Sequence, residues 1–232
     1  MIRKYLFIVG FFSCLVTAEF SNSFLEKVKE SGNDSTAFIF KIGTLGVGAD
    51  FEYIYNSFLG LRANLNGFSY KDSGKLEEND YNYAINLKTI GVLVDYHPWQ
   101  NAFRFSFGMY ENLSTINAKV KPTSGEIVVA DHKYKSRQIG DINTDILLNK
   151  KNPYFGLGFS STEIKGVHFS LDVGVLYIGS PQAKLTAKAA KGYEGLQDIL
   201  EKEARIEEEK INNDISKYKY YPVLSVGMQY KF

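Results

Sequence analysis

The side chains best suited to acid–base catalysis in this sequence are its three histidines, His97, His132 and His168. A serine nucleophile needs such a base within hydrogen-bond distance. His97 and His168 lie beside short turns at one end of the strands predicted below, whereas His132 lies in a long segment at the other end. Flexible, basic sequence separates His132 from Ser136. We therefore expect that the protein is not an enzyme and has no catalytic residues.

Metal and cofactor chemistry is equally poorly supported. The Asp131–His132 pair and the acids between Asp141 and Asp145 lack the ligand spacing of a zinc site or an EF-hand loop. The only cysteine, Cys14, lies in an apolar N-terminal segment, which excludes a disulfide in the mature chain. The 27 basic and 26 acidic residues nearly cancel, so there is no strong field for nucleic acid. We expect no cofactor, no metal ion and no nucleic-acid partner.

Charged residues instead occur singly within segments in which apolar and polar residues alternate. Phe103, Phe105 and Phe107, for example, alternate with Arg104 and Ser106. Alternation with a period of two predicts β-strands, and segments of this length suit tilted strands that cross a membrane. The polar side of these segments is rich in Gly, Ser and Asn with single charges of both signs, as a tight barrel interior requires. We therefore expect the apolar side to face lipid.

The predicted fold class is all-β: a transmembrane, antiparallel, up-and-down β-barrel. Strands are expected near residues 44–55, 58–71, 83–97, 102–121, 141–160, 167–189 and 220–232. A closed antiparallel barrel needs an even number of strands, and residues 36–42 are the only stretch available for an eighth. Eight strands are therefore expected, and ten remain the alternative.

The connections between these strands are of two alternating kinds. Residues 55–58, 98–102 and 161–167 are short, whereas residues 72–81, 122–140 and 190–217 are long and charged. Short periplasmic turns and long external loops are typical of outer-membrane barrels. Between Tyr193 and Ser216, apolar residues at helical spacing predict a helix in the last long loop.

The inward side of the predicted strands carries a cluster of charged residues. Its members are Asp50, Glu52, Arg62, Asp95, Arg104, Asp172 and Lys231. In a barrel so narrow that side chains fill it, these charges would pair, and removing one partner would cost about 3–5 kcal/mol. The cluster thus predicts a plugged interior that fixes the geometry of the barrel. A narrow path for solutes remains the alternative.

The N-terminus has the features of a signal peptide. Arg3 and Lys4 precede an apolar run that ends in the small residues of Val16-Thr17-Ala18. The run is too short for a helix that crosses a hydrocarbon layer of about 30 Å. We expect residues 1–18 to be a signal peptide, residues 19–35 a periplasmic lead and residues 36–232 the barrel.

The C-terminal segment 221–232 is similar to the closing strand of many bacterial outer-membrane proteins, because it alternates aromatic and polar residues up to a final Phe232. In that family the barrel-assembly machinery recognises this strand. The resemblance therefore implies that Tyr230 and Phe232 form an assembly signal. Residues 43–48 and the hairpin 55–62 also look like the opening of small barrels of the OmpA/OmpW-like kind.

This resemblance implies a porin-type fold in the bacterial outer membrane, in contact with outer-membrane lipid and lipopolysaccharide. It does not imply an activity, because one fold hosts many functions. The function expected is that of an envelope anchor, or of a surface-loop interaction protein whose external partner the sequence does not name. The alternative is a narrow porin-like channel for small hydrophilic or amphipathic solutes.

Overall fold

The computed structural model describes residues 35–76, 79–130, 132–160 and 165–232. The predicted signal peptide and all but the last residue of the predicted lead lie outside the described residues. The strands are β1 (Ser35–Gly43), β2 (Gly46–Ile54), β3 (Leu59–Leu76), β4 (Asn79–Tyr96), β5 (Phe103–Asn112), β6 (Thr115–Lys121), β7 (Glu126–Val129), β8 (His132–Lys135), β9 (Ile139–Leu147), β10 (Lys151–Phe159), β11 (Gly166–Tyr177), β12 (Gln182–Ala189) and β13 (Tyr220–Lys231). The helical elements are η1 (Ser136–Gln138), η2 (Glu194–Leu196) and α2 (Gln197–Ile215).

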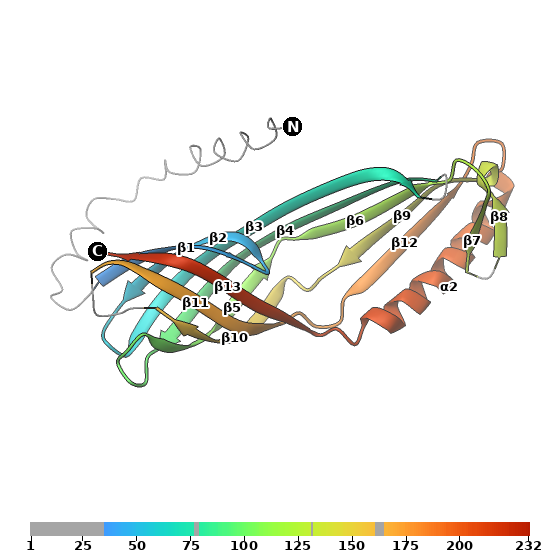
Figure 1. Cartoon of the computed structure of the whole chain (residues 1–232). Helices are drawn as coiled ribbons and strands as arrows, with labels where there is room; N and C mark the ends of the chain where they lie inside the picture. Colours follow the sequence, from blue (N-terminus) through green and yellow to red (C-terminus); the bar gives the residue numbers. More distant parts are fainter. Residues whose placement is uncertain (1–34, 77–78, 131, 161–164) are drawn as a thin grey trace, which may run out of the picture.

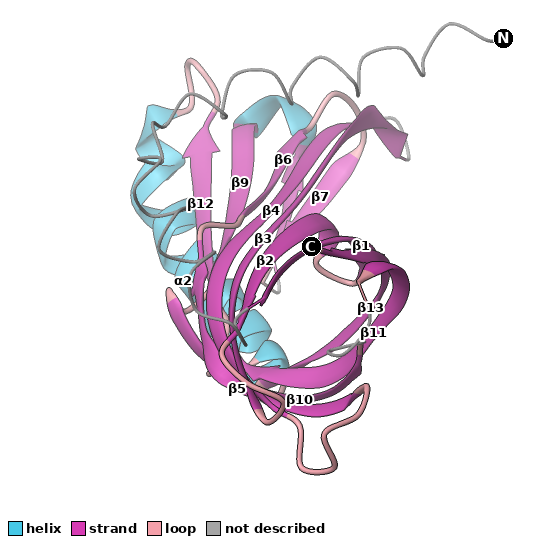
Figure 2. Cartoon of the chain, turned by 90° about the vertical axis from the view of Figure 1, so that its left-hand side faces the viewer, coloured by secondary structure: helices cyan, strands magenta, loops and turns pink. Residues whose placement is uncertain are grey.

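Eight of the strands form a closed antiparallel barrel, which Figure 2 shows along its axis. Neighbours follow the order β1, β2, β3, β4, β5, β10, β11 and β13, and β13 pairs with β1 to close the ring. The prediction of an eight-stranded barrel is confirmed, and the ten-stranded alternative is wrong. The segment expected as the eighth strand is β1, which pairs with both β2 and β13.

The outside of this barrel is an apolar belt. Along each strand, side chains of one parity point outward, since successive residues of a strand face opposite sides. Phe40, Val92 and Phe169 expose 57%, 55% and 61% of their surface there. Many residues of the opposite parity are buried even where they are polar or charged, as at Arg62 and Asp172. The arrangement is that of a membrane barrel, in which the apolar side faces out.

Beyond the barrel, the sheet continues as an open extension (Figure 1). We call this extension the upper sheet: residues 68–76 of β3, residues 79–88 of β4, and the strands β6, β9 and β12. The prediction of a loop at residues 72–81 is wrong, because β3 and β4 stay paired as far as Leu76 and Asn79. We refer to the two ends of the barrel as the sheet end and the turn end, the latter holding the short turns near residues 55–58 and 97–102.

Three strands expected to be single are each interrupted once, between β5 and β6, β9 and β10, and β11 and β12. The neighbouring strand β4 nevertheless continues past the first of these interruptions and pairs with both β5 and β6. Thr89 of β4 lies opposite Asn112 of β5, and Asn86 lies opposite Thr115 of β6, which is the same register. Each interruption therefore marks the level at which the sheet leaves the closed barrel.

Helix α2 lies along the free edge of β12, where a further strand would otherwise pair. The backbone N–H groups of Ala183 and Ala189 donate to the side chains of Asn212 and Gln197, at 2.6 and 2.8 Å. Leu200 of the helix is completely buried against the sheet. The predicted helix in the last long loop is confirmed. No helix in the described ranges has the length and apolar character needed to cross a membrane.

Candidate functional site

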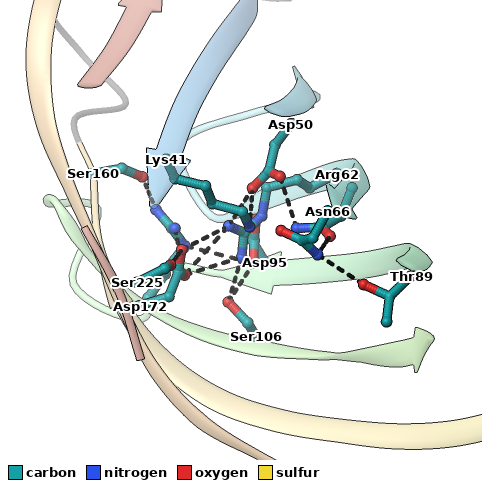
Figure 3. Close-up of polar contacts among 12 residues, drawn as sticks. Lys41, Asp50, Arg62, Asn66, Thr89, Asp95, Ser106, Ser160, Asp172 and Ser225 are labelled. Carbon is teal, nitrogen blue, oxygen red and sulfur yellow. Dashed lines mark hydrogen bonds and ion pairs between the residues drawn. The ribbon is translucent and has the colours of Figure 1, made fainter. Parts of the chain in front are cut away.

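A layer of charged side chains crosses the middle of the barrel interior (Figure 3). Arg62 of β3 lies at its centre. Its Nε is 2.8 Å from Asp95 Oδ2, and its Nη1 is 3.1 Å from Asp50 Oδ2 and 3.1 Å from Asp172 Oδ2. The three carboxylates belong to β4, β2 and β11, so one guanidinium connects strands from opposite walls of the barrel.

Two further bases complete this charged layer. Arg104 of β5 has its Nη2 2.7 Å from Asp172 Oδ1, and its Nη1 donates a hydrogen bond to the hydroxyl of Ser160. Lys41 of β1 has its Nζ 2.9 Å from Asp50 Oδ2. The charged layer consists of Lys41, Asp50, Arg62, Asp95, Arg104 and Asp172. Its three positive and three negative charges balance, as burial away from water demands.

The structure brings five of the seven predicted interior charges into this layer, and it places the other two nearer the turn end. Glu52 is buried and accepts a hydrogen bond from Gln229 Nε2 at 2.9 Å. Lys231 is 6% exposed on the inward side of β13, opposite Ala37 of β1. The predicted assembly residues Tyr230 and Phe232 lie on the outside of the same strand end, about half exposed.

Lys41 was missed as an interior charge, although its sequence signal was present. It alternates with Phe40 and Ile42 and shares its side of β1 with Ile39, which is completely buried. Extending the inward parity to this strand would have placed a cation near Asp50, which lies across from Ile39 in the register.

A second, apolar layer closes the interior at the sheet end, and the sequence did not predict it. It consists of Leu93, Tyr110, Tyr154, Leu176 and Val223. The rings of Tyr110 and Tyr154 meet edge to face, with centroids 5.4 Å apart. Leu45, in the tight turn between β1 and β2, packs against this apolar layer. The side chains come from β4, β5, β10, β11 and β13, so the layer spans the barrel.

Inward-facing glycines provide the space for these large side chains. A Cβ at Gly156 or at Gly174 would collide with the Tyr154 hydroxyl. A Cβ at Gly158 would approach Arg104 Nε to 2.7 Å. Small residues opposite large ones let a narrow eight-stranded barrel fill its own interior. Between the two layers, the cavity beside Lys41 and Ser225 measures only about 10 Å³, room for a single water molecule.

His97 and His132, two of the three histidines, lie apart and contact different groups. His97 is buried at the turn end, with Nδ1 2.9 Å from the carbonyl oxygen of Asn101. His132 lies near α2, with Nδ1 2.8 Å from Glu203 Oε1, and the Tyr134 hydroxyl donates to the same carboxylate at 2.6 Å. Burial and this hydrogen bond raise the pKa of Tyr134 to about 12. Among the described residues, no three His, Cys, Asp or Glu side chains are grouped so as to hold a metal ion.

Among the solved structures that resemble this one over most of its length are two from Acinetobacter baumannii. The crystal structure of Acinetobacter baumannii CarO2 matches 85% of this chain and 98% of its own, with 22% sequence identity and a TM-score of 0.55. The crystal structure of Acinetobacter baumannii CarO also matches 85% of this chain and 98% of its own, with 21% sequence identity and a TM-score of 0.54. The chain has the fold of a small outer-membrane β-barrel protein. The resemblance predicted from the C-terminal strand is thereby confirmed at the level of fold.

Other comparisons add little. A major outer membrane protein from Thermus thermophilus aligns with 86% of this chain at 10% identity, with a TM-score of 0.39, too low to support an argument. No protein-family model and no curated protein sequence matches the chain. At the identities observed, the likeness to the two CarO structures describes the fold alone.

Proposed function

We propose that the protein is a non-enzymatic barrel of the bacterial outer membrane that anchors the upper sheet at the cell surface. The observation that carries the proposal is the interior, which two side-chain layers cross. The apolar belt supports a place in lipid, and the signal peptide predicted from the sequence supports export. A filled interior suits an anchor, because an anchor needs a rigid and impermeable wall.

The charged layer would resist the opening of a path through the barrel interior. Arg62 contacts Asp50, Asp95 and Asp172 at the same time, and all four side chains are 0–4% exposed. Moving the guanidinium aside would leave three buried carboxylates with only two positive charges, those of Lys41 and Arg104, in a region of low dielectric. Breaking one buried pair already costs about 3–5 kcal/mol. Spontaneous opening by displacement of Arg62 is therefore rare.

A narrow channel is the second candidate, and one feature of the wall favours it. Asn64 Nδ2 donates to Asp50 Oδ1 at 2.7 Å, and Asn66 Nδ2 donates to Asn64 Oδ1 at 2.6 Å and to Thr89 Oγ1 at 3.0 Å. This polar track leads from the charged layer toward the sheet end. It offers hydrogen-bond partners to a small hydrophilic solute, provided that the apolar layer opens.

Conductance in planar bilayers separates the two candidates. The unmodified protein should conduct almost no current. Replacing Arg62 and Arg104 by Ser should produce a measurable cation-selective current, because Asp95 and Asp172 then lose their counter-charges and only Lys41 remains to balance Asp50. Adding Tyr154→Ala to this double variant should raise the current further, since it widens the apolar layer.

The matched control is Arg205→Ser, which removes a guanidinium from the exposed side of α2. It should leave the conductance at the unmodified level. Steady conduction by the unmodified protein, unchanged in the Arg62→Ser/Arg104→Ser variant, would reject the anchor and establish the channel.

A further inference from the structure

The outer face of the upper sheet continues the lipid-facing side of the barrel. Along β3, Leu61 and Leu65 point outward, and the same parity continues with Ser69 and Lys71. The register between β3 and β4 is unbroken from Leu59 to Leu76, so no bulge turns the strand over. The outward face of the upper sheet therefore rises directly from the apolar belt.

The chemistry of this face changes abruptly where the belt ends. Along the described parts of β3, β4 and β6, four outward lysines, Lys71, Lys88, Lys119 and Lys121, are exposed, whereas the one outward acid is Asp80. The neighbouring β9 adds Asp141 and Asp145 to this face. The opposite face of the same strands is largely apolar and aromatic. A cationic surface just beyond a lipid-facing belt is complementary to the anionic groups of the outer leaflet.

A groove of about 520 Å³ lies within this cationic face. Lys71 and Ser73 of β3, Asn82 of β4, and Asn117 and Lys119 of β6 line it. Asn and Ser side chains offer donors and acceptors that match sugar hydroxyls, and lysine ammonium groups bind phosphate. The volume falls in the range of sites for small ligands. The combination suits a phosphorylated sugar better than an apolar or cationic ligand.

Three acids lie near the groove: Asp72, Asp141 and Asp145, the last of which accepts a hydrogen bond from Asn117 Nδ2 at 3.2 Å. Asp72, Tyr83 and Ala84 complete the lining, and the Tyr83 hydroxyl donates to Asp72 Oδ2 at 3.4 Å. Lys119 Nζ is 2.8 Å from Asp141 Oδ2, but the two side chains are 47% and 34% exposed. Because an exposed ion pair contributes little free energy, a phosphate group can replace Asp141 as the partner of Lys119.

We propose that this groove binds the phosphorylated sugars of lipopolysaccharide in the surrounding outer leaflet. Lipopolysaccharide fits better than a soluble phosphate or polysaccharide because the groove lies on the side of the strands that faces lipid, above the end of the apolar belt. A ligand anchored in the leaflet is held at that position by its own acyl chains. The proposal rests on the outer-membrane location proposed above.

The test is a binding measurement with the full barrel purified in detergent. Unmodified protein should bind purified lipopolysaccharide, and enzymatic removal of its phosphates should weaken binding about tenfold. A Lys71→Gln/Lys119→Gln variant should show a similar loss. A Lys184→Gln/Lys188→Gln variant is the matched control, because it removes two exposed lysines from the same face of the sheet on β12, away from the groove. It should bind within about twofold of the unmodified protein.

Three outcomes would overturn the inference. Equal losses of affinity in the two double variants would show that binding depends on the overall charge of the face rather than on the groove. Equal affinity for dephosphorylated lipopolysaccharide would exclude recognition of phosphate. Competition by millimolar inorganic phosphate alone would show that free phosphate is the ligand.

Fractionation of cells tests the underlying proposal separately. Recovery of the protein as a soluble periplasmic species would reject the outer-membrane function. Recovery in the outer membrane together with no binding of lipopolysaccharide would reject the groove alone.

Discussion

Arg62 contacts three carboxylates that come from three different strands, and it is the residue on which the charged layer depends most. Its side chain has no exposed surface, and neither do Asp50 and Asp95. A neutral residue at this position would leave a net negative charge inside the barrel. The first consequence is a loss of stability, because the interior offers little water to solvate the remaining carboxylates.

Replacing Arg62 by Met keeps most of the side-chain volume and removes the charge. We expect the free energy of unfolding, measured by denaturant titration in detergent micelles or vesicles, to fall by about 3–5 kcal/mol. Arg205→Met on the exposed side of α2 is the control and should change it by less than about 0.5 kcal/mol. A loss at Arg62 no larger than that of the control would mean that the charged layer does not stabilise the barrel.

Single-residue features of the interior were predictable to different degrees. Inward-facing charges follow from strand parity alone, which is why Arg62 and Asp172 could be placed on one side of their strands from the sequence. Tyr154 also has inward parity, yet nothing local shows that it points across the interior over Gly156 and Gly174. That contact depends on the pairing of β10 with β11, which parity does not specify.

At the scale of elements, α2 protects the exposed edge of β12. Beyond the contacts of Asn212 and Gln197 with the strand, Glu208 Oε2 accepts a hydrogen bond from the N–H of Leu185 at 2.8 Å. An unprotected edge strand presents unpaired N–H and C=O groups to other chains. Because α2 immediately precedes β13, the chain covers β12 with a helix before it covers β11 with a strand.

Replacing Gln197, Glu208 and Asn212 together by Ala should release this edge while the barrel stays folded. Each lost hydrogen bond contributes roughly 0.5–1.5 kcal/mol, so hydrogen exchange at Ala183, Leu185 and Ala189 should accelerate by at least about tenfold. Replacing the exposed Lys202, Arg205 and Glu209 by Ala is the control. Unchanged exchange in the triple variant would show that the edge does not need the helix side chains.

The interruptions of the three long strands had local signals that period-two alternation concealed. Asn112, Asn149 and Gly179 lie at them, and Gly179 has a positive φ of 67° that favours glycine. A Cβ at Gly179 would collide with the side-chain amide of Asn149, so two of the interruptions lie side by side. Alternation resumes after each one, as at Ile116 and Val120, and therefore suggested single strands. Periodicity reports which side a residue faces, whereas the partner strands decide where a sheet closes.

At the scale of the whole molecule, the barrel is complete only when its last strand pairs with its first. β13 lies between β1 and β11, and the N–H of Phe232 donates to the carbonyl oxygen of Thr36 at 3.0 Å. The Phe232 ring meets Phe38 and Tyr230 at centroid distances of 5.8 and 5.0 Å. These contacts lie at the outer surface of the turn end and leave the ring half exposed.

Deleting Phe232 should therefore affect assembly in cells far more than the stability of the finished barrel. The half-buried ring contributes about 1 kcal/mol, whereas the resemblance of the terminal strand to known assembly signals implies that its last residue is read during insertion. We expect the truncated protein to be depleted from the outer membrane several-fold in pulse-labelled cells. After refolding into detergent, its free energy of unfolding should fall by only about 1 kcal/mol. Tyr177→Ala removes another half-exposed ring, one paired with Tyr220 at 5.5 Å, and should leave assembly unchanged. Normal insertion of the truncated chain, or equal depletion of the Tyr177→Ala variant, would show that Phe232 acts as one more surface aromatic rather than as a signal.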